Sequence, residues 1–179
     1  MGWFSNTPTA NRMQNTATIL ACAALIEANQ NILQGVEQFS TAQITRGNRL
    51  SAQAFSIQGA SSSVGTQLQQ AVGELNSFKR EARGLLSELS EHAEYFEALV
   101  EQFSVPRAAR QLNLSGKEMT EVAAHITASS LANLAMLRDS RQDKIAQSVA
   151  TIDRADETLN PGSHTRASLA LPAMAFRDS

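Results

Sequence analysis

The stretch LNSFKREARGLLSELSEHAEYFEALVEQF, residues 75–103, repeats apolar side chains at every seventh position. The repeating row contains Leu75, Ala82, Leu89, Phe96 and Phe103, and the alternate positions contain Leu86, Ala93 and Val100. A repeat of seven held over about four heptads is typical of a helix in a coiled coil or a helix bundle. We therefore predict one long helix that ends before Pro106, and we expect these residues to form the seam along which copies of the chain assemble.

A first helix is predicted upstream of this stretch. Thr7 is a good N-cap residue, Pro8 suits the first helical position, and no proline occurs between Pro8 and Pro106. Apolar residues recur at helical spacing at Ile19, Ala23, Ile26, Leu33 and Val36. This pattern predicts a helix from about residue 9 to residue 39, and a weaker pattern extends it through residue 57. Gly47 and Gly59 leave the continuity of that extension open, because glycine weakens a helix interior or marks a close backbone approach.

A third helix is predicted after the turn that contains Pro106. Ser115 and Glu118 have the spacing of a capping box, so the helix should begin at about Gly116. Its apolar stripe is Met119, Val122, Ile126, Leu134, Leu137, Ile145, Val149 and Ile152, and NPGS at 160–163 should end it near Leu159. The tail beyond carries an apolar patch of Leu169, Leu171, Met174 and Phe176. We expect this tail either to dock on another surface or to fray.

The fold class follows from these helices and from the lack of any β-strand alternation between turn residues. We predict an all-α protein, an elongated, coiled-coil-like and oligomeric bundle of three long helices. Its expected parts are a charge-poor N-terminal helical region (1–66), an antiparallel helical hairpin (67–160) and a C-terminal tail (161–179). With aromatic residues at only 5% of the chain, such helices have little core of their own and should pack against copies or partner helices.

Length and charge exclude several function classes. The chain has 179 residues, about one domain, and a net charge of -2 that gives no overall attraction to nucleic acid or acidic lipid. Cys22 is the single cysteine, so the chain cannot form an internal disulfide. The apolar run 17–28 has no basic segment before it and is shorter than the roughly 20 residues that span a bilayer. Neither a signal peptide nor a membrane-spanning helix is therefore expected.

The N-terminal third of the chain is poor in charge. Up to Gln67 the charged residues are Arg12, Glu27, Glu37, Arg46 and Arg49, and the window 53–70 has none. Alanine, serine, glycine and glutamine suit close approach between helices, either in a membrane or in a packed oligomer. We therefore expect a membrane-facing or ring-lining face made of Ile19, Leu20, Ala23, Leu25, Ile26 and Leu33. For residues 59–65 alone, a flexible polar linker is the alternative interpretation.

Groups that could perform chemistry are few. His92 and His125 each follow a glutamate by four residues, whereas di-iron bundles use a three-residue step, so solvated Glu–His pairs are expected rather than a metal site. The chain also contains no phosphate loop, nucleophile elbow or Cys/His ligand spacing, and Ser61–Ser63 lacks a nearby base. We therefore expect no enzyme activity, no cofactor and no bound metal.

Two sets of charged side chains have open interpretations. Glu88, Glu91, Glu94, Glu97 and Glu101 form an acidic stripe, which is either a solvated face or a surface for a basic partner. The small basic groups are Lys79, Arg80 and Arg83, then Arg107 and Arg110. Because no aromatic side chains are interleaved with them, they favour ordinary helix salt bridges over nucleic-acid binding.

The N-terminal half resembles a known group of viral proteins. The segments MGWFSNTPTANRMQNTATILACAAL, IEANQNILQGVEQF and RLSAQAFSIQGASSS, within residues 1–91, are similar in layout and composition to small internal virion proteins of short-tailed bacteriophages. The resemblance implies a protein packed near the portal inside the capsid and ejected before the genome. It also implies a channel in the host envelope, with the chain itself, portal or core proteins and the host membrane as partners, and with only non-specific DNA contact. The implied locations are the capsid interior and, after ejection, the host envelope.

Two other function classes fit the same features. A translocator or filament subunit of a type III secretion apparatus would also be helical and rich in alanine, serine and glutamine. A cytoplasmic coiled-coil adaptor would use the acidic stripe to bind a basic partner.

Overall fold

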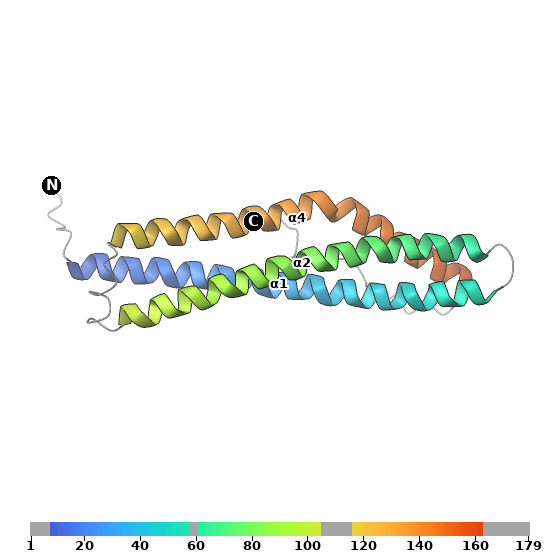
Figure 1. The fold of residues 1–179 in the computed structure, drawn as a ribbon, viewed down its shortest axis with the longest axis horizontal. Coiled ribbons are helices and arrows are strands. Elements are labelled where there is room, and N and C mark those ends of the chain that lie inside the picture. The colour runs from blue at the N-terminus through green and yellow to red at the C-terminus, as the bar shows by residue number, and fades with distance from the viewer. Residues whose placement is uncertain (1–7, 58–60, 105–115, 163–179) are drawn as a thin grey trace. The chain divides into compact units, whose positions relative to one another are not determined.

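The computed structural model describes residues 8–57, 61–104 and 116–162, and these form three α-helices with no strand among them. Helix α1 is Pro8–Ser56, α2 is Ser61–Ser104 and α4 is Gly116–Leu159 (Figure 1). The all-α class and the helical bundle predicted from the sequence are confirmed. Thr7, Gly59, Ser115, Arg107, Arg110 and the apolar patch of the tail lie outside the described residues.

The observed helix ends agree closely with the helix-starting and helix-ending residues identified in the sequence. Helix α1 begins at Pro8, runs without interruption through Gly47 and ends at Ser56, so the weaker extension beyond residue 39 is correct. Helix α4 ends at Leu159, where the Asn160 N–H donates to the Asp156 carbonyl oxygen at 2.8 Å. Gly162 then adopts a φ of 86°, a left-handed conformation that glycine reaches without the strain of a Cβ atom.

The chain forms two compact units, each containing a segment of all three helices. Unit 1 is drawn from Met1–Asn31 and Ser87–Leu134, and unit 2 from Ile32–Leu86 and Ala135–Ser179. This division falls within each helix, between residues 31 and 32, 86 and 87, and 134 and 135. The division expected at residues 66 and 160 instead follows changes in composition. The division at residues 66 and 160 stays a prediction.

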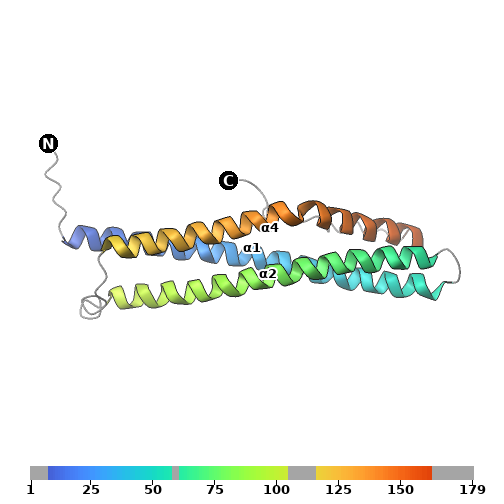
Figure 2. The ribbon, with the colours of Figure 1, turned by 45° about the horizontal axis from the view of Figure 1, so that its top comes forward.

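In unit 2 the order of contacts fixes the direction of each helix. Arg46 contacts Asp153 and Gln53 contacts Asn160, both 107 residues further along the chain, so α1 and α4 are parallel. Glu37 contacts Arg83 and Ser51 contacts Gly65, so the separation falls from 46 to 14 residues and α1 and α2 are antiparallel. Figure 2 shows the same directions.

The core of unit 2 is lined on α1 by a row of small residues. Ser40, Gly47 and Ala54 are buried seven residues apart, after Leu33 in the same row. A Cβ atom added at Gly47 would lie 2.6 Å from Val72 Cγ2 and 3.4 Å from Ile152 Cδ1. This glycine therefore serves a close approach between helices, which is one of the two roles that the sequence left open.

The charge-free window 53–70 covers the end of α1 and the start of α2. The Phe55 ring lies over Gly65, where an added Cβ would be 2.7 Å from Phe55 Cζ. The Gln53 and Asn160 side-chain amides exchange two hydrogen bonds, of 2.9 and 3.1 Å. In unit 2 this window therefore makes close helix contacts that need small residues and amides but no charge.

Unit 1 is held by a core of larger side chains. Ile19 and Ile26 of α1, Leu89 and Phe96 of α2 and Met119 of α4 are all buried there. Two polar contacts set the helix register. Thr120 donates to the Asn15 side-chain oxygen at 3.1 Å, and Gln30 donates to the Ser90 hydroxyl at 3.4 Å.

Candidate assembly surface

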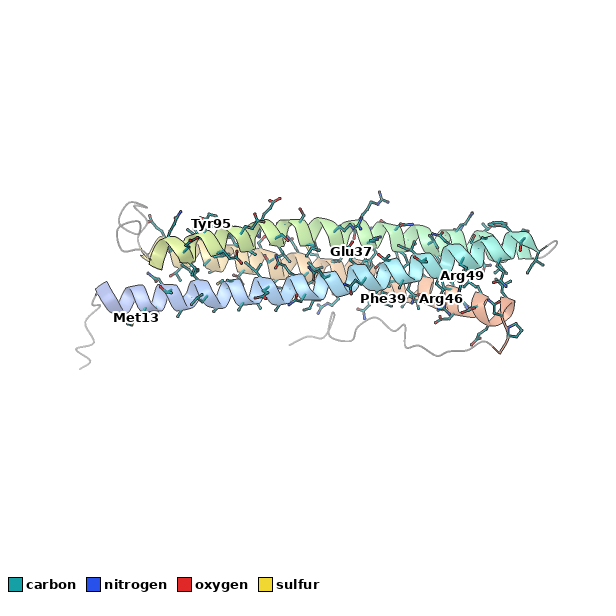
Figure 3. The ribbon with its side chains drawn as sticks, turned by 90° about the horizontal axis from the view of Figure 1, so that it is seen from below. Met13, Glu37, Phe39, Arg46, Arg49 and Tyr95 are labelled. Carbon is teal, nitrogen blue, oxygen red and sulfur yellow. The ribbon has the colours of Figure 1, made fainter. Side chains whose placement is uncertain are left out.

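The outer side of α1 in unit 1 has apolar side chains that are exposed among the described residues. Met13 is 71% exposed and Leu20 is 50% exposed, and the alanines around them are exposed as well. The residues recur at steps of three and four, so they share one side of the helix, opposite Ile19 and Ile26. Figure 3 shows Met13 on this outer side. We name it the α1 alanine face: Met13, Ala17, Leu20, Ala21, Ala24 and Ala28.

Helix α4 adds a second uncharged stretch to unit 1. Its residues 122–134 include no charged side chain, and Val122 and Leu131, which lie on opposite sides of the helix, are 39% and 43% exposed. The Asn15–Thr120 hydrogen bond places the start of the charge-free α1 stretch, 13–26, level with the start of this α4 stretch. Parallel helices keep that register, so the two uncharged stretches lie side by side.

Helix α2 gives unit 1 a surface of the opposite character. Glu88, Glu91, Glu94, Glu97 and Glu101 are all exposed, and α2 presents them away from its buried Leu89 and Phe96. Within the described residues, none of the first four forms an ion pair with a basic side chain. Unit 1 therefore has an uncharged outer surface on α1 and α4 and an acidic one on α2.

In unit 2, by contrast, several ion pairs join charged side chains of different helices. Arg46 donates to Asp153 at 2.5 Å and to Asp156 at 2.7 Å, and Arg83 donates to Glu37 at 2.5 Å (Figure 3). The hydrogen bond from Arg46 holds the pKa of Asp156 below its usual value.

A second cluster of ion pairs in unit 2 joins α2 to α4. Arg141 donates to both carboxylate oxygens of Glu81, and this hydrogen bonding lowers the pKa of Glu81. Arg141 also lies 3.7 Å from Glu74 and donates to the Ser77 hydroxyl. These pairs stabilise unit 2 internally and leave it less suited than unit 1 to a partner helix.

An open groove of about 640 Å³ lies between α2 and α4 in unit 2. Its lining is mostly uncharged and polar: Gln67, Gln70, Gly73, Gln147, Ser148 and Thr151, with Glu74 and Lys144 at its sides. The glutamines at the end of the charge-free window therefore face this groove.

Four residues of the seam predicted on α2 lie in the chain's own core, whereas the role of this seam in assembly stays a prediction. In unit 2, Leu75 and Ala82 are fully buried, and in unit 1 Leu89 and Phe96 are buried against α1 and α4. A side chain that is already covered offers no surface to a second copy. Leu86, Ala93 and Val100 are half-buried, and the Phe103 side chain lies outside the described residues.

The second row of this seam also differs from the prediction. Phe78 and Leu99 are buried three residues after Leu75 and Phe96, whereas the predicted residues four after members of the row, Leu86, Ala93 and Val100, are only half-buried. An α-helix has 3.6 residues per turn, so a step of three residues and a step of four residues both return close to the same face. The size of the side chains then decides which of the two positions is buried. Phe78 and Leu99 fill more of the core than Ala93 could.

The membrane-facing or ring-lining residues predicted on α1 divide between two sides of the helix. Ile19, Ile26 and Leu33 are buried in the bundle, Ala23 is half-buried, and Leu20 and Leu25 are exposed. The role of this set in facing a membrane or lining a ring stays a prediction. The predicted face did not include Met13, Ala17, Ala21, Ala24 and Ala28, although a second repeat at steps of three and four through these positions and Leu20 is present in the sequence.

Three buried polar side chains were not expected. The Asn29 Nδ2 and His92 Nδ1 atoms of unit 1, and both amide atoms of Gln43 in unit 2, are buried without a hydrogen-bond partner among the described residues. Gln43 is fully buried. Asn29 and Gln43 follow the Ile26 row at core positions, so the spacing of α1 could have identified them.

The described residues contain no group of three or more His, Cys, Asp or Glu that could hold a metal ion. Among the same residues, no helix has a stretch both long and apolar enough to cross a membrane. Comparisons with protein-family models, curated proteins and solved structures found no match to this chain.

Proposed function

We propose that this protein is a structural component of a bacteriophage virion, an internal core or ejection protein that assembles in multiple copies near the portal. In this proposal the copies help form the channel by which DNA crosses the host envelope. The observation that carries the proposal is the uncharged outer surface of unit 1, where Met13 and Leu20 are 71% and 50% exposed. The weak resemblance of residues 1–91 to such proteins supplies the biological setting.

The physical argument for assembly rests on what this surface gains when it is covered. Burying apolar surface contributes about 25 cal/mol per Å², so a second helix on Met13 and Leu20 is favourable. The alanines between them let a partner backbone approach closely, as small residues do at helix interfaces. No charge between residues 13 and 26 has to lose its water in the process.

The role of the α2 seam is different in this proposal from the role expected from sequence. Leu75, Ala82, Leu89 and Phe96 hold each copy together, and assembly uses the outer surface of α1. The coiled-coil-like packing is then made between the helices of one copy. Contacts between copies are made through the α1 alanine face.

Contact with the host membrane is proposed for the assembled protein rather than for a single helix. No described helix can span a bilayer alone, but several copies that assemble through α1 could turn their uncharged α4 stretches, residues 122–134, toward the membrane. The acidic α2 surfaces would then turn toward the inside of the assembly. An acidic lining would repel the DNA backbone, so DNA contact would be non-specific and brief.

Two measurements test the proposal. Native mass measurement of the full chain, with and without detergent, should give multimers, and a monomer under both conditions would contradict assembly. Release of dye from liposomes by the purified chain should require the α1 alanine face.

The gene neighbourhood separates the virion from the two alternatives. We expect capsid and portal genes beside the gene for this protein. Secretion-ring genes would instead support a type III translocator or filament subunit. A stable monomer that binds a basic peptide through α2 would support the adaptor.

A further inference from the structure

We infer that two copies of this chain pair through their α1 alanine faces in an antiparallel arrangement, with the two-fold axis next to Leu20 and Ala21. The inference rests on the proposed function only in assuming that copies meet. It adds the partner, the direction and the residue pairing.

The small and large side chains of the α1 alanine face alternate in a way that suits an antiparallel pair. About a two-fold axis between residues 20 and 21, Ala17 of one copy lies opposite Ala24 of the other, and Leu20 lies next to its own counterpart. The alanine pairs let the helices come within the 8–10 Å of close helix packing. Leu20 at the centre and Met13 toward each end then fill the space beside the alanines, and both are exposed in the single chain.

Charge decides the direction of the pair. Glu27 is exposed at the edge of the face and is the one charged residue between residues 13 and 31. In a parallel pair the two Glu27 carboxylates would lie side by side and repel each other. In the antiparallel pair they lie at opposite ends, about 20 Å apart along the helix axis, beside uncharged residues of the partner.

A lipid surface is a poorer occupant for this face than a second copy. Helices that lie in a membrane interface carry lysine and arginine on their polar side, and residues 13–31 have none. The exposed glutamates of α2 in the same unit would also be repelled by anionic headgroups. Alanine adds little apolar area toward lipid, whereas it favours close contact between helices.

The pair should be weak in isolation. From Met13 to Ala28 the face is about 24 Å long and one helix wide, so it buries less than the roughly 1,200 Å² of a standard interface. High local concentration in a multi-copy assembly would compensate for this. Disulfide trapping suits such a contact, because it captures a geometry that is populated only part of the time.

The test uses the full chain with Cys22→Ala as the background, so that introduced cysteines are the only thiols. Ala17→Cys and Ala24→Cys are prepared separately, mixed and oxidised, and the products are separated by size. We expect a covalent dimer in the mixture and at least tenfold less from either variant alone. In each single variant the two sulfurs would be offset by about seven residues, or 10.5 Å, which a disulfide cannot span. Glu94→Cys, on the exposed acidic side of α2, is the control and should give no dimer.

Each other outcome overturns the inference in a recognisable way. Dimers from Ala17→Cys alone and from Ala24→Cys alone would show a parallel pair. No dimer from the mixture would exclude pairing through this face. Native mass measurement of the Cys22→Ala chain then distinguishes the two proposals: multimers without the 17–24 dimer contradict only the pairing, whereas a monomer contradicts assembly as well.

Discussion

Gly47 of α1 lies so close to Val72 of α2 that a Cβ atom at position 47 would sit 2.6 Å from Val72 Cγ2. Glycine in a helix interior costs up to about 1 kcal/mol relative to alanine. In unit 2 this cost is offset by packing, because the missing side chain lets α1 pack directly on α2. Valine is stiff at χ1, so it cannot easily move aside for an added methyl group.

Gly47→Ala should therefore destabilise the chain, by about 1–3 kcal/mol, although alanine is the better helix former. Gly35→Ala is the matched control in the same helix and the same unit, since nothing lies within 4 Å of an added Cβ there. It should stabilise the chain by up to about 1 kcal/mol. Urea unfolding measures both, and equal effects of the two substitutions would contradict the close contact at Gly47.

Phe96→Ala should destabilise the chain by about 3–5 kcal/mol, because Phe96 is fully buried in unit 1 and its removal leaves a cavity. The neighbouring Tyr95 is 45% exposed, so Tyr95→Ala should have a much smaller effect. Thermal unfolding followed by circular dichroism compares the two. If Phe96→Ala left stability unchanged and reduced only assembly, the α2 seam would belong between copies after all.

These two cases show what the sequence could and could not reveal. The heptad of residues 75–103 predicted a covered face on α2 correctly, because burial alone imposes that spacing. It could not identify the covering helix, since α1, α4 and a second copy impose the same pattern. The helix ends were predictable because Pro8, Pro106 and the 160–162 turn act locally.

The core row of α1 was harder to recognise. Its later members Ser40, Gly47 and Ala54 are small or polar, so they do not resemble an apolar repeat although all three are buried. Without a recognisable core row that continues from them, Ile19 and Ile26 were predicted on a membrane-facing or ring-lining face, whereas they are buried. The exposed alanines were overlooked because alanine is common on both sides of a helix.

Gln43→Met should raise stability by about 1 kcal/mol. The Gln43 side chain is fully buried, and both of its amide atoms lack a partner among the described residues. An unsatisfied buried polar group costs about 1–3 kcal/mol, and methionine keeps the length of the side chain without that cost. Gln38→Met, on the exposed side of α1, is the control and should change the urea midpoint little. A loss of stability in Gln43→Met would mean that the amide has a favourable partner.

Arg46→Gln should destabilise the chain by about 1–2 kcal/mol at pH 7, and by less at pH 3. Arg46 lowers the folded-state pKa of Asp156. The stabilisation by this pair is therefore present above the unfolded pKa of about 3.9 and is lost as the pH falls through the lower folded pKa.

The control for this pH dependence is Arg154→Gln. Arg154 is exposed and donates to the Ala150 carbonyl oxygen of its own helix. The free energy of unfolding of both variants is compared with the unsubstituted chain at pH 7 and pH 3. A difference for Arg46→Gln that stays constant with pH would be incompatible with titration of Asp156.

Sedimentation velocity of three full-length chains tests the role of the α1 alanine face most directly. The chains are the unsubstituted protein, Leu20→Glu and Ile57→Glu, since Leu20 and Ile57 are similarly exposed at 50% and 46% but only Leu20 lies on the face. Helical content by circular dichroism should be equal in all three, because neither substituted side chain is in the core. We predict that the unsubstituted protein and Ile57→Glu shift from monomers to multimers as their concentration rises, and that Leu20→Glu stays monomeric over the same range. Multimers of Leu20→Glu at the same concentration, with the same helical content, would contradict assembly through this face.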